Sequence, residues 1–168
     1  RSSLGTFLSF FNQITDALSC DGGIRGDLHS SYAAQFMPAF NISYMVMPAL
    51  KLYGSIGKSF RAPSYTELYY TSPSRIGNAN LQPEEGWSSE LGALYFVSPS
   101  SRFTLSGFQR YQTNLIDYVK LTAADGAYSA MNFTKAVTRG VEVQWEWRSL
   151  SASWLEEIQL GYGYLDSH

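Results

Sequence analysis

The stretch that decides the fold lies between residues 60 and 92 and reads FRAPSYTELYY at 60–70, IGNANLQPE at 76–84 and WSSELG at 87–92. Pro63 has a fixed φ and no backbone N–H, so it ends strand pairing, and Pro83 does the same on the far side. Gly77 and Asn78 tolerate the backbone angles of tight turns. The stretch therefore predicts a long loop, residues 61–85, between two strands.

Alternation of apolar and polar residues with a period of two extends outward from this loop in both directions. It is cleanest in 141–148, where Val141, Val143, Trp145 and Trp147 oppose Glu142, Gln144, Glu146 and Arg148. We expect nine strands, at 4–12, 18–30, 35–46, 50–60, 86–97, 102–119, 127–134, 137–148 and 157–166. Their usual length of about 9–12 residues is what a tilted strand needs to cross a bilayer. The pattern predicts an all-β antiparallel meander with almost no helix.

Alternation alone does not separate a membrane barrel from a soluble β-sandwich, because both architectures bury one face of a sheet. Two details favour the barrel. Aromatic residues gather toward the expected strand ends, among them Trp87, Tyr118 and Tyr162, as interfacial girdles require. The polar face carries small hydrophilic residues, which suit a wet lumen. Short turns at 47–49 and 98–101 also alternate with longer connections, which is the usual layout of an outer-membrane barrel.

The motifs of residues 60–92 resemble the hallmark of TonB-dependent outer-membrane receptors. That family carries F-R-A-P and E-L-Y, then a loop, G-N-x-x-L-x-P-E, and a strand with E-x-G. The matching positions in this chain are Phe60, Arg61, Ala62, Pro63, Glu67, Leu68, Tyr69, Gly77, Asn78, Leu81, Pro83, Glu84, Glu90 and Gly92. The run Asn114–Tyr118, Asn132 and the run Arg139–Glu142 extend the resemblance, which is close over 50–166 and looser over 18–46.

The resemblance implies a bacterial outer-membrane protein that captures a scarce nutrient complex and imports it with energy delivered by the TonB complex. Such barrels have about 22 strands around a plug. We therefore expect residues 1–168 to form part of a barrel domain, embedded in membrane lipid, with the plug and the TonB-binding segment outside these residues. Among possible ligands, the run at 68–84 together with Leu115-Ile-Asp-Tyr118 looks most like vitamin B12 receptors. Haem receptors carry a His where residues 64–76 have none, and ferric-siderophore receptors stay open as an alternative.

The long loop is the expected ligand-binding segment, and its part Ser64–Arg75 is rich in tyrosine. Tyr and Arg give large amphipathic contacts at modest entropic cost, and loops on a rigid scaffold are where recognition usually resides. We expect the loop to be extracellular and the ligand to contact Tyr65, Tyr70, Arg75 and Asn78. For Tyr69 and Tyr70, a place in the aromatic girdle is an equal alternative. Arg61 is expected to anchor the loop base, through Glu67 or Glu84.

Composition excludes several other classes. Charged residues make up only 15% of the chain and the net charge is −2, which gives no reason to expect nucleic acid as a partner. Cys20 is the only cysteine, so no internal disulfide forms. Residues 54–59 resemble a phosphate-binding loop but lack its first glycine, and they lie in a strand pattern. His29 and His168 form no metal motif. We expect no enzyme and no cofactor; a porin, an adhesin or a soluble β-sandwich module are the competing classes.

Overall fold

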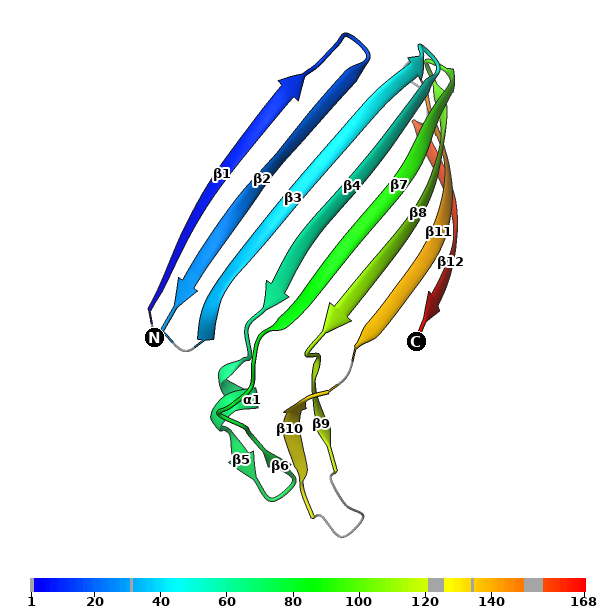
Figure 1. The fold of residues 1–168 in the computed structure, drawn as a ribbon. Helices are drawn as coiled ribbons and strands as arrows, with labels where there is room; N and C mark the ends of the chain where they lie inside the picture. The colour runs from blue at the N-terminus through cyan, green and yellow to red at the C-terminus, as the bar shows by residue number, and fades with distance from the viewer. Residues whose placement is uncertain (1, 31, 121–125, 134, 150–155) are drawn as a thin grey trace.

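The computed structural model describes residues 2–30, 32–120, 126–133, 135–149 and 156–168. Eight long strands form one antiparallel sheet in the order β1-β2-β3-β4-β7-β8-β11-β12. Figure 1 shows this sheet as a single curved layer that does not close, with the N- and C-terminal strands at its two edges. The strands are β1 (Ser3–Gln13), β2 (Leu18–His29), β3 (Tyr32–Met47), β4 (Leu50–Arg61), β7 (Glu84–Ser98), β8 (Ser101–Thr113), β11 (Ala136–Arg148) and β12 (Glu157–Ser167). The all-β antiparallel meander that the alternation predicts is confirmed.

The register sorts the side chains onto two chemically different faces. One row of paired positions contains Asn41, Ser55 and Glu90, and the next row contains Ile42, Gly54 and Leu91. We call these the polar face and the apolar face. Tyr162 and Leu91 on the apolar face are each 74% exposed, because no second layer covers the sheet in the described chain. The sheet therefore presents an apolar surface for which the described residues supply no partner.

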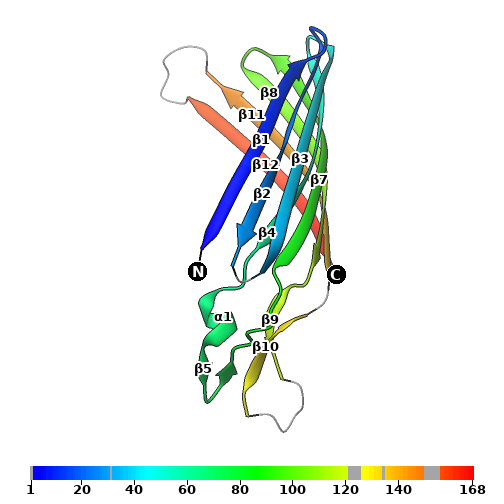
Figure 2. The ribbon, with the colours of Figure 1, turned by 60° about the vertical axis from the view of Figure 1, so that its left-hand side comes forward.

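The two ends of the sheet carry different connections. The β3–β4 and β7–β8 turns are two residues long, at 48–49 and 99–100. At the opposite end, long excursions leave β4 and β8, and both lie below the sheet in Figures 1 and 2. Among the described residues, no helix has the length and apolar character needed to cross a membrane.

Both excursions fold into one small unit, which we call the loop subdomain. It consists of α1 (Tyr65–Tyr69), β5 (Thr71–Ser72), β6 (Arg75–Ile76), β9 (Ile116–Val119) and β10 (Tyr128–Asn132). The four strands form a second sheet in the order β5-β6-β10-β9. β6 and β10 pair in parallel, through Tyr128 with Arg75 and Ser129 with Ile76. The two loops are therefore joined to each other and do not hang separately from the sheet.

Two expected strands differ from the structure. The run 102–119 is not one strand, because β8 ends at Thr113 and Asn114 adopts a positive φ of 56° that breaks the ladder. The run 127–134 does not join the long meander, because β10 pairs with β6 and β9. The main sheet thus has eight of the nine expected strands, and the ninth belongs to the loop subdomain.

Candidate functional site

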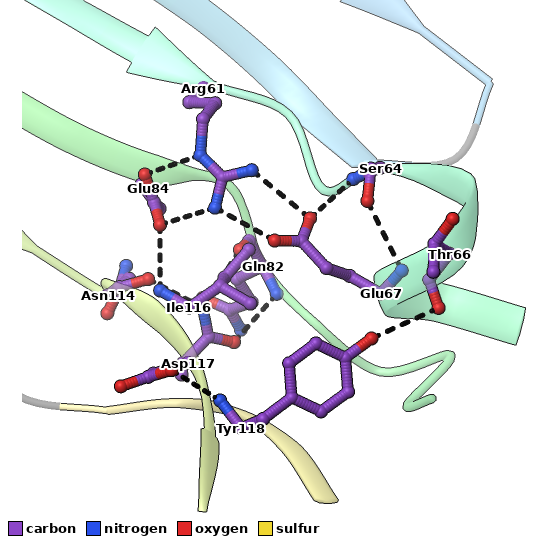
Figure 3. Close-up of polar contacts among 11 residues, drawn as sticks. Arg61, Ser64, Thr66, Glu67, Gln82, Glu84, Asn114, Ile116, Asp117 and Tyr118 are labelled. Carbon is purple, nitrogen blue, oxygen red and sulfur yellow. Dashed lines mark hydrogen bonds and ion pairs between the residues drawn. The ribbon is translucent and has the colours of Figure 1, made fainter. Parts of the chain in front are cut away.

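Arg61 joins the three segments that meet at the base of the loop subdomain (Figure 3). Its Nε and Nη2 donate to the Glu84 carboxylate at 2.7 and 2.6 Å, and its Nη1 and Nη2 donate to the Glu67 carboxylate at 3.1 Å each. The guanidinium thus forms two paired contacts, the geometry in which arginine binds carboxylates most strongly. Because Arg61 ends β4, Glu84 begins β7 and Glu67 lies in α1, the three side chains close the loop at its base.

The local sequence explains how Glu67 reaches this position. Ser64 and Glu67 form a capping box: the Glu67 N–H donates to Ser64 Oγ at 3.2 Å, and the Ser64 N–H donates to Glu67 Oε2 at 2.7 Å. Burial, the largest single influence on Glu67, raises its pKa, but the hydrogen bonds from Arg61 and Ser64 together outweigh it. The pKa of Glu67 therefore lies below its usual value, and the carboxylate stays ionised beside Arg61.

The second loop is attached to the first by hydrogen bonds that cross between them. The Ile116 N–H donates to Glu84 Oε1 at 2.8 Å, next to the contact with Arg61. The Asn132 side chain accepts from the Gln82 N–H at 2.9 Å and donates to the Gln82 carbonyl at 2.9 Å and to the Asn114 carbonyl at 2.8 Å. These bonds give partners to backbone N–H and C=O groups of the two loops, outside the main sheet. The two loops therefore form one structural unit.

A small apolar core lies inside the loop subdomain. Leu68, Leu81 and Ala130 are buried there, and Ile116 and Tyr118 pack against them. Gly77 approaches this core so closely that an added Cβ would lie 2.9 Å from Leu68 C and Tyr69 N, both backbone atoms. Only glycine fits at that position without a shift of the chain. Pro63 and Pro83, which flank the excursion, are also buried.

The residues predicted to contact a ligand all lie in this unit, with different surroundings. Tyr65 is 70% exposed and its ring lies 5.1 Å from that of Tyr69. Tyr70 is 52% exposed. The Arg75 guanidinium lies 5.2 Å from the centre of the Tyr118 ring, in cation–π contact. The other predicted residue, Asn78, accepts from the Asn80 N–H at 2.9 Å through its side-chain oxygen, and its own N–H donates to the Glu67 carbonyl at 2.8 Å. Asn78 is thus engaged in shaping the turn, while Tyr65 and Tyr70 are exposed.

The remaining motif residues also support the fold of the loop base. Phe60 packs edge-on against Tyr32 with ring centres 5.9 Å apart, and Tyr32 stacks on His29 at 4.1 Å. This stack ties the ends of β2, β3 and β4 together next to Arg61. At the opposite end of the sheet, Glu146 forms an ion pair with Arg102.

The sequence interpretation missed two features of the site. Asn132 and Tyr118 join the loops, yet no local pattern reveals their partners Gln82 and Thr66, which lie 50 and 52 residues away in the chain. Both residues belong to motifs of the family resemblance, but a motif does not name the contacts that its residues make. Loop-to-loop contact is a property of the folded sheet, which brings the two excursions to the same end.

Comparison with known proteins identifies the family. The family model described as "TonB dependent receptor-like, beta-barrel" matches residues 1–168. The chain belongs to the TonB-dependent receptor family. Among curated proteins, it is 25% identical over 169 residues to the vitamin B12 transporter BtuB of Photobacterium profundum, covering 99% of this chain and 26% of that protein. It is 27% identical over 129 residues to BtuB of Vibrio vulnificus, covering 76% of this chain and 20% of that protein.

Solved structures give the same fold. The siderophore receptor PirA of Pseudomonas aeruginosa matches with a TM-score of 0.78 at 20% identity, over 97% of this chain and 32% of that receptor. The FrpB iron transporter of Neisseria meningitidis matches with a TM-score of 0.70 at 14% identity, over 98% of this chain and 25% of that transporter. The BtuB of Photobacterium profundum aligns with nearly the whole chain, and the chain spans about a quarter of its length. TonB-dependent receptors are outer-membrane proteins, and the eight-stranded sheet has the fold of their barrel wall.

Proposed function

We propose that residues 1–168 form part of the barrel wall and two ligand-binding loops of an outer-membrane receptor that imports cobalamin. The observation that carries this is the loop subdomain: a rigidly anchored unit at one end of the sheet, with exposed tyrosines and an arginine on it. Its base contains four hydrogen bonds from Arg61 to two carboxylates. Recognition loops on a rigid base lose less conformational entropy when a ligand binds.

The two faces of the sheet fit this proposal. The apolar face, with residues such as Leu91, Val141 and Tyr162, suits the hydrocarbon of a bilayer, and the polar face suits a wet lumen. Short turns then lie on the periplasmic side and the loop subdomain on the extracellular side, the usual arrangement of such barrels. Import would draw on the TonB complex, which contacts parts of the receptor outside these residues.

Cobalamin is favoured over iron complexes by the sequence relatives. Vitamin B12 transporters match the chain at 25–33% identity. The siderophore and iron receptors among the solved structures are 14–21% identical, a level at which the likeness concerns the fold. Residues 64–76 also contain no histidine that could bind haem iron.

The function is tested by binding of cyanocobalamin to the purified full-length receptor. The Tyr70→Ala, Arg75→Ala double variant removes an exposed aromatic ring and a cation from the loop subdomain. We expect it to weaken binding by about 2–4 kcal/mol, the usual loss for two anchor residues. The matched control is Thr71→Ala, an exposed neighbour with a small side chain, which should change affinity little.

Folding of each variant is checked by heat-modifiable gel mobility, because Arg75 also packs on Tyr118. Unchanged affinity in a folded double variant would remove the binding role from this loop. Failure of the wild-type receptor to bind cyanocobalamin, with binding of a ferric siderophore instead, would replace the ligand proposed here.

A further inference from the structure

Arg110 differs from the other described arginines on the polar face because no carboxylate of the described residues pairs with it. The other four are each paired: Arg25 with Asp27, Arg61 with Glu67 and Glu84, Arg102 with Glu146, and Arg148 with Glu157. Arg110 lies on β8 between Ser88 and Thr138 of the neighbouring strands. Within the described residues its side chain makes no hydrogen bond or ion pair.

Arg110 lines two adjoining cavities on this face, directly beneath the loop base. One has a volume of about 350 Å³ and is also lined by Ser88, Phe108 and Thr138. The other, of about 180 Å³, reaches Arg61 and Gln112. The hydroxyl groups of Ser88 and Thr138 and the amide of Gln112 thus line the same cavities as Arg110, on the polar face of the sheet. This combination suits an oxygen-rich anionic group.

The carboxylates that line the same cavities are already engaged with other donors. Glu84 accepts from Arg61. Glu85 pairs with Lys58 at 2.8 Å, and Glu90 accepts from the Tyr53 hydroxyl at 3.0 Å. Among the described residues that line the larger cavity, Arg110 carries the only positive charge and Glu90 a negative one, so the cavity has no second cation to balance a second anionic charge. The site is suited to one singly charged oxyanion.

We propose that Arg110 binds a single oxyanion of the imported solute, a phosphodiester or a carboxylate, once the solute has moved from the loops into the lumen. The inference rests on the proposed import function and adds a specificity-determining residue to it. Cobalamin has one phosphodiester in its nucleotide arm, which is the class of group that this site accepts. A neutral solute would gain no binding energy from the charge of the Arg110 guanidinium.

The test uses the full-length receptor and two corrinoids, cyanocobalamin and dicyanocobinamide, which lacks the phosphodiester arm. Arg110→Gln should lower affinity for cyanocobalamin on the order of tenfold and leave that for dicyanocobinamide unchanged, as expected for loss of one charge-assisted hydrogen bond. Arg102→Gln, on the same face but paired with Glu146 at the far end of the sheet, is the control and should affect neither. An equal effect of Arg110→Gln on both corrinoids, or none on either, overturns the inference.

A second readout keeps this inference separate from the proposed function. Dimethyl phosphate, a minimal singly charged phosphodiester, should raise the melting temperature of the wild-type receptor relative to sodium chloride at equal ionic strength. Arg110→Gln should abolish that rise, and Arg102→Gln should keep it. If neither corrinoid binds the wild type, import of cobalamin is refuted while this response still decides the role of Arg110. No response in the wild type, or a response unchanged by Arg110→Gln, contradicts the site.

Discussion

At the scale of single residues, Arg61 joins β4, α1 and β7 through four side-chain hydrogen bonds. One guanidinium binds the carboxylates of Glu67 and Glu84, whose side chains are only 16% and 12% exposed. Glu84 in turn accepts the Ile116 N–H. Loss of Arg61 would leave the partly buried carboxylates of Glu67 and Glu84 without their cation. Such uncompensated charges are costly, whereas the intact pair contributes little net energy.

We expect Arg61→Ala to loosen the loop subdomain by about 1–3 kcal/mol, a range reduced for the partial exposure of the arginine. The measurement is hydrogen exchange of peptides covering 64–84 and 114–119 in the full-length receptor. Arg61→Lys should restore only part of the protection, because an ammonium group cannot form both bidentate contacts. Protection equal to wild type in Arg61→Ala would show that the other loop contacts suffice.

At the scale of elements, the sequence predicts the long strands well and the loop subdomain poorly. Strand β11 (Ala136–Arg148) can be predicted from the sequence, because Val141, Val143 and Trp145 alternate with polar residues. Such alternation places apolar side chains on one face of a sheet and polar side chains on the other. The loop base was predictable too, since Arg61 and two nearby glutamates are complementary charges. By contrast, β10 pairs with β6 in parallel at two positions, and no local periodicity predicts that pairing.

The same limit explains the missed break after β8. The apolar residues Leu115 and Ile116 continue the strand pattern, yet Asn114 adopts φ 56° and redirects the chain. Asparagine permits this backbone conformation without requiring it. Its carbonyl bond to Asn132 is part of what stabilises the turn, and that partner lies in another element. Contacts between distant segments decide such positions.

Two glycines provide a matched test of how tightly the loop subdomain is packed. An added Cβ at Gly77 would meet backbone atoms at 2.9 Å, whereas at Gly126 it would meet nothing within 4 Å. Neither glycine has a positive φ, so the difference is one of space. Gly77→Ala should therefore increase hydrogen exchange in 64–84 severalfold, and Gly126→Ala should not.

Full-length receptors carrying each change serve for this comparison, with barrel folding checked by gel mobility. Equal protection in the two variants would mean that the contact between Gly77 and α1 is easily relaxed. The subdomain would then be a looser assembly than its hydrogen bonds indicate.

At the scale of the whole molecule, the sheet is a single layer with opposite chemistry on its two faces. Neighbouring positions on β11 separate these faces cleanly: Val143 lies on the apolar face and Gln144 on the polar face, and both are exposed. In water such an apolar surface would promote association. Against lipid it is the stable arrangement, because most backbone groups of the inner strands pair within the sheet.

Val143→Arg should destabilise the full-length receptor in lipid vesicles by about 2–4 kcal/mol, the cost of a cation near the middle of the lipid-facing side. Gln144→Arg, one residue away on the lumenal side, should cost far less. Urea unfolding followed by tryptophan fluorescence gives both values. Similar costs for the two changes would argue that lipid does not face Val143.

The central claim is that the loop subdomain lies outside the cell and meets the ligand there. The direct measurement is labelling of intact cells with a membrane-impermeant maleimide, on full-length receptors carrying Thr71→Cys or Pro99→Cys, against the background of the wild type. Thr71 is exposed beside Tyr70, and Pro99 lies in a turn at the other end of the sheet. We predict that position 71 is labelled, that cyanocobalamin protects it, and that position 99 is labelled only after the outer membrane is permeabilised. Labelling of position 99 but not 71 in intact cells would contradict the account.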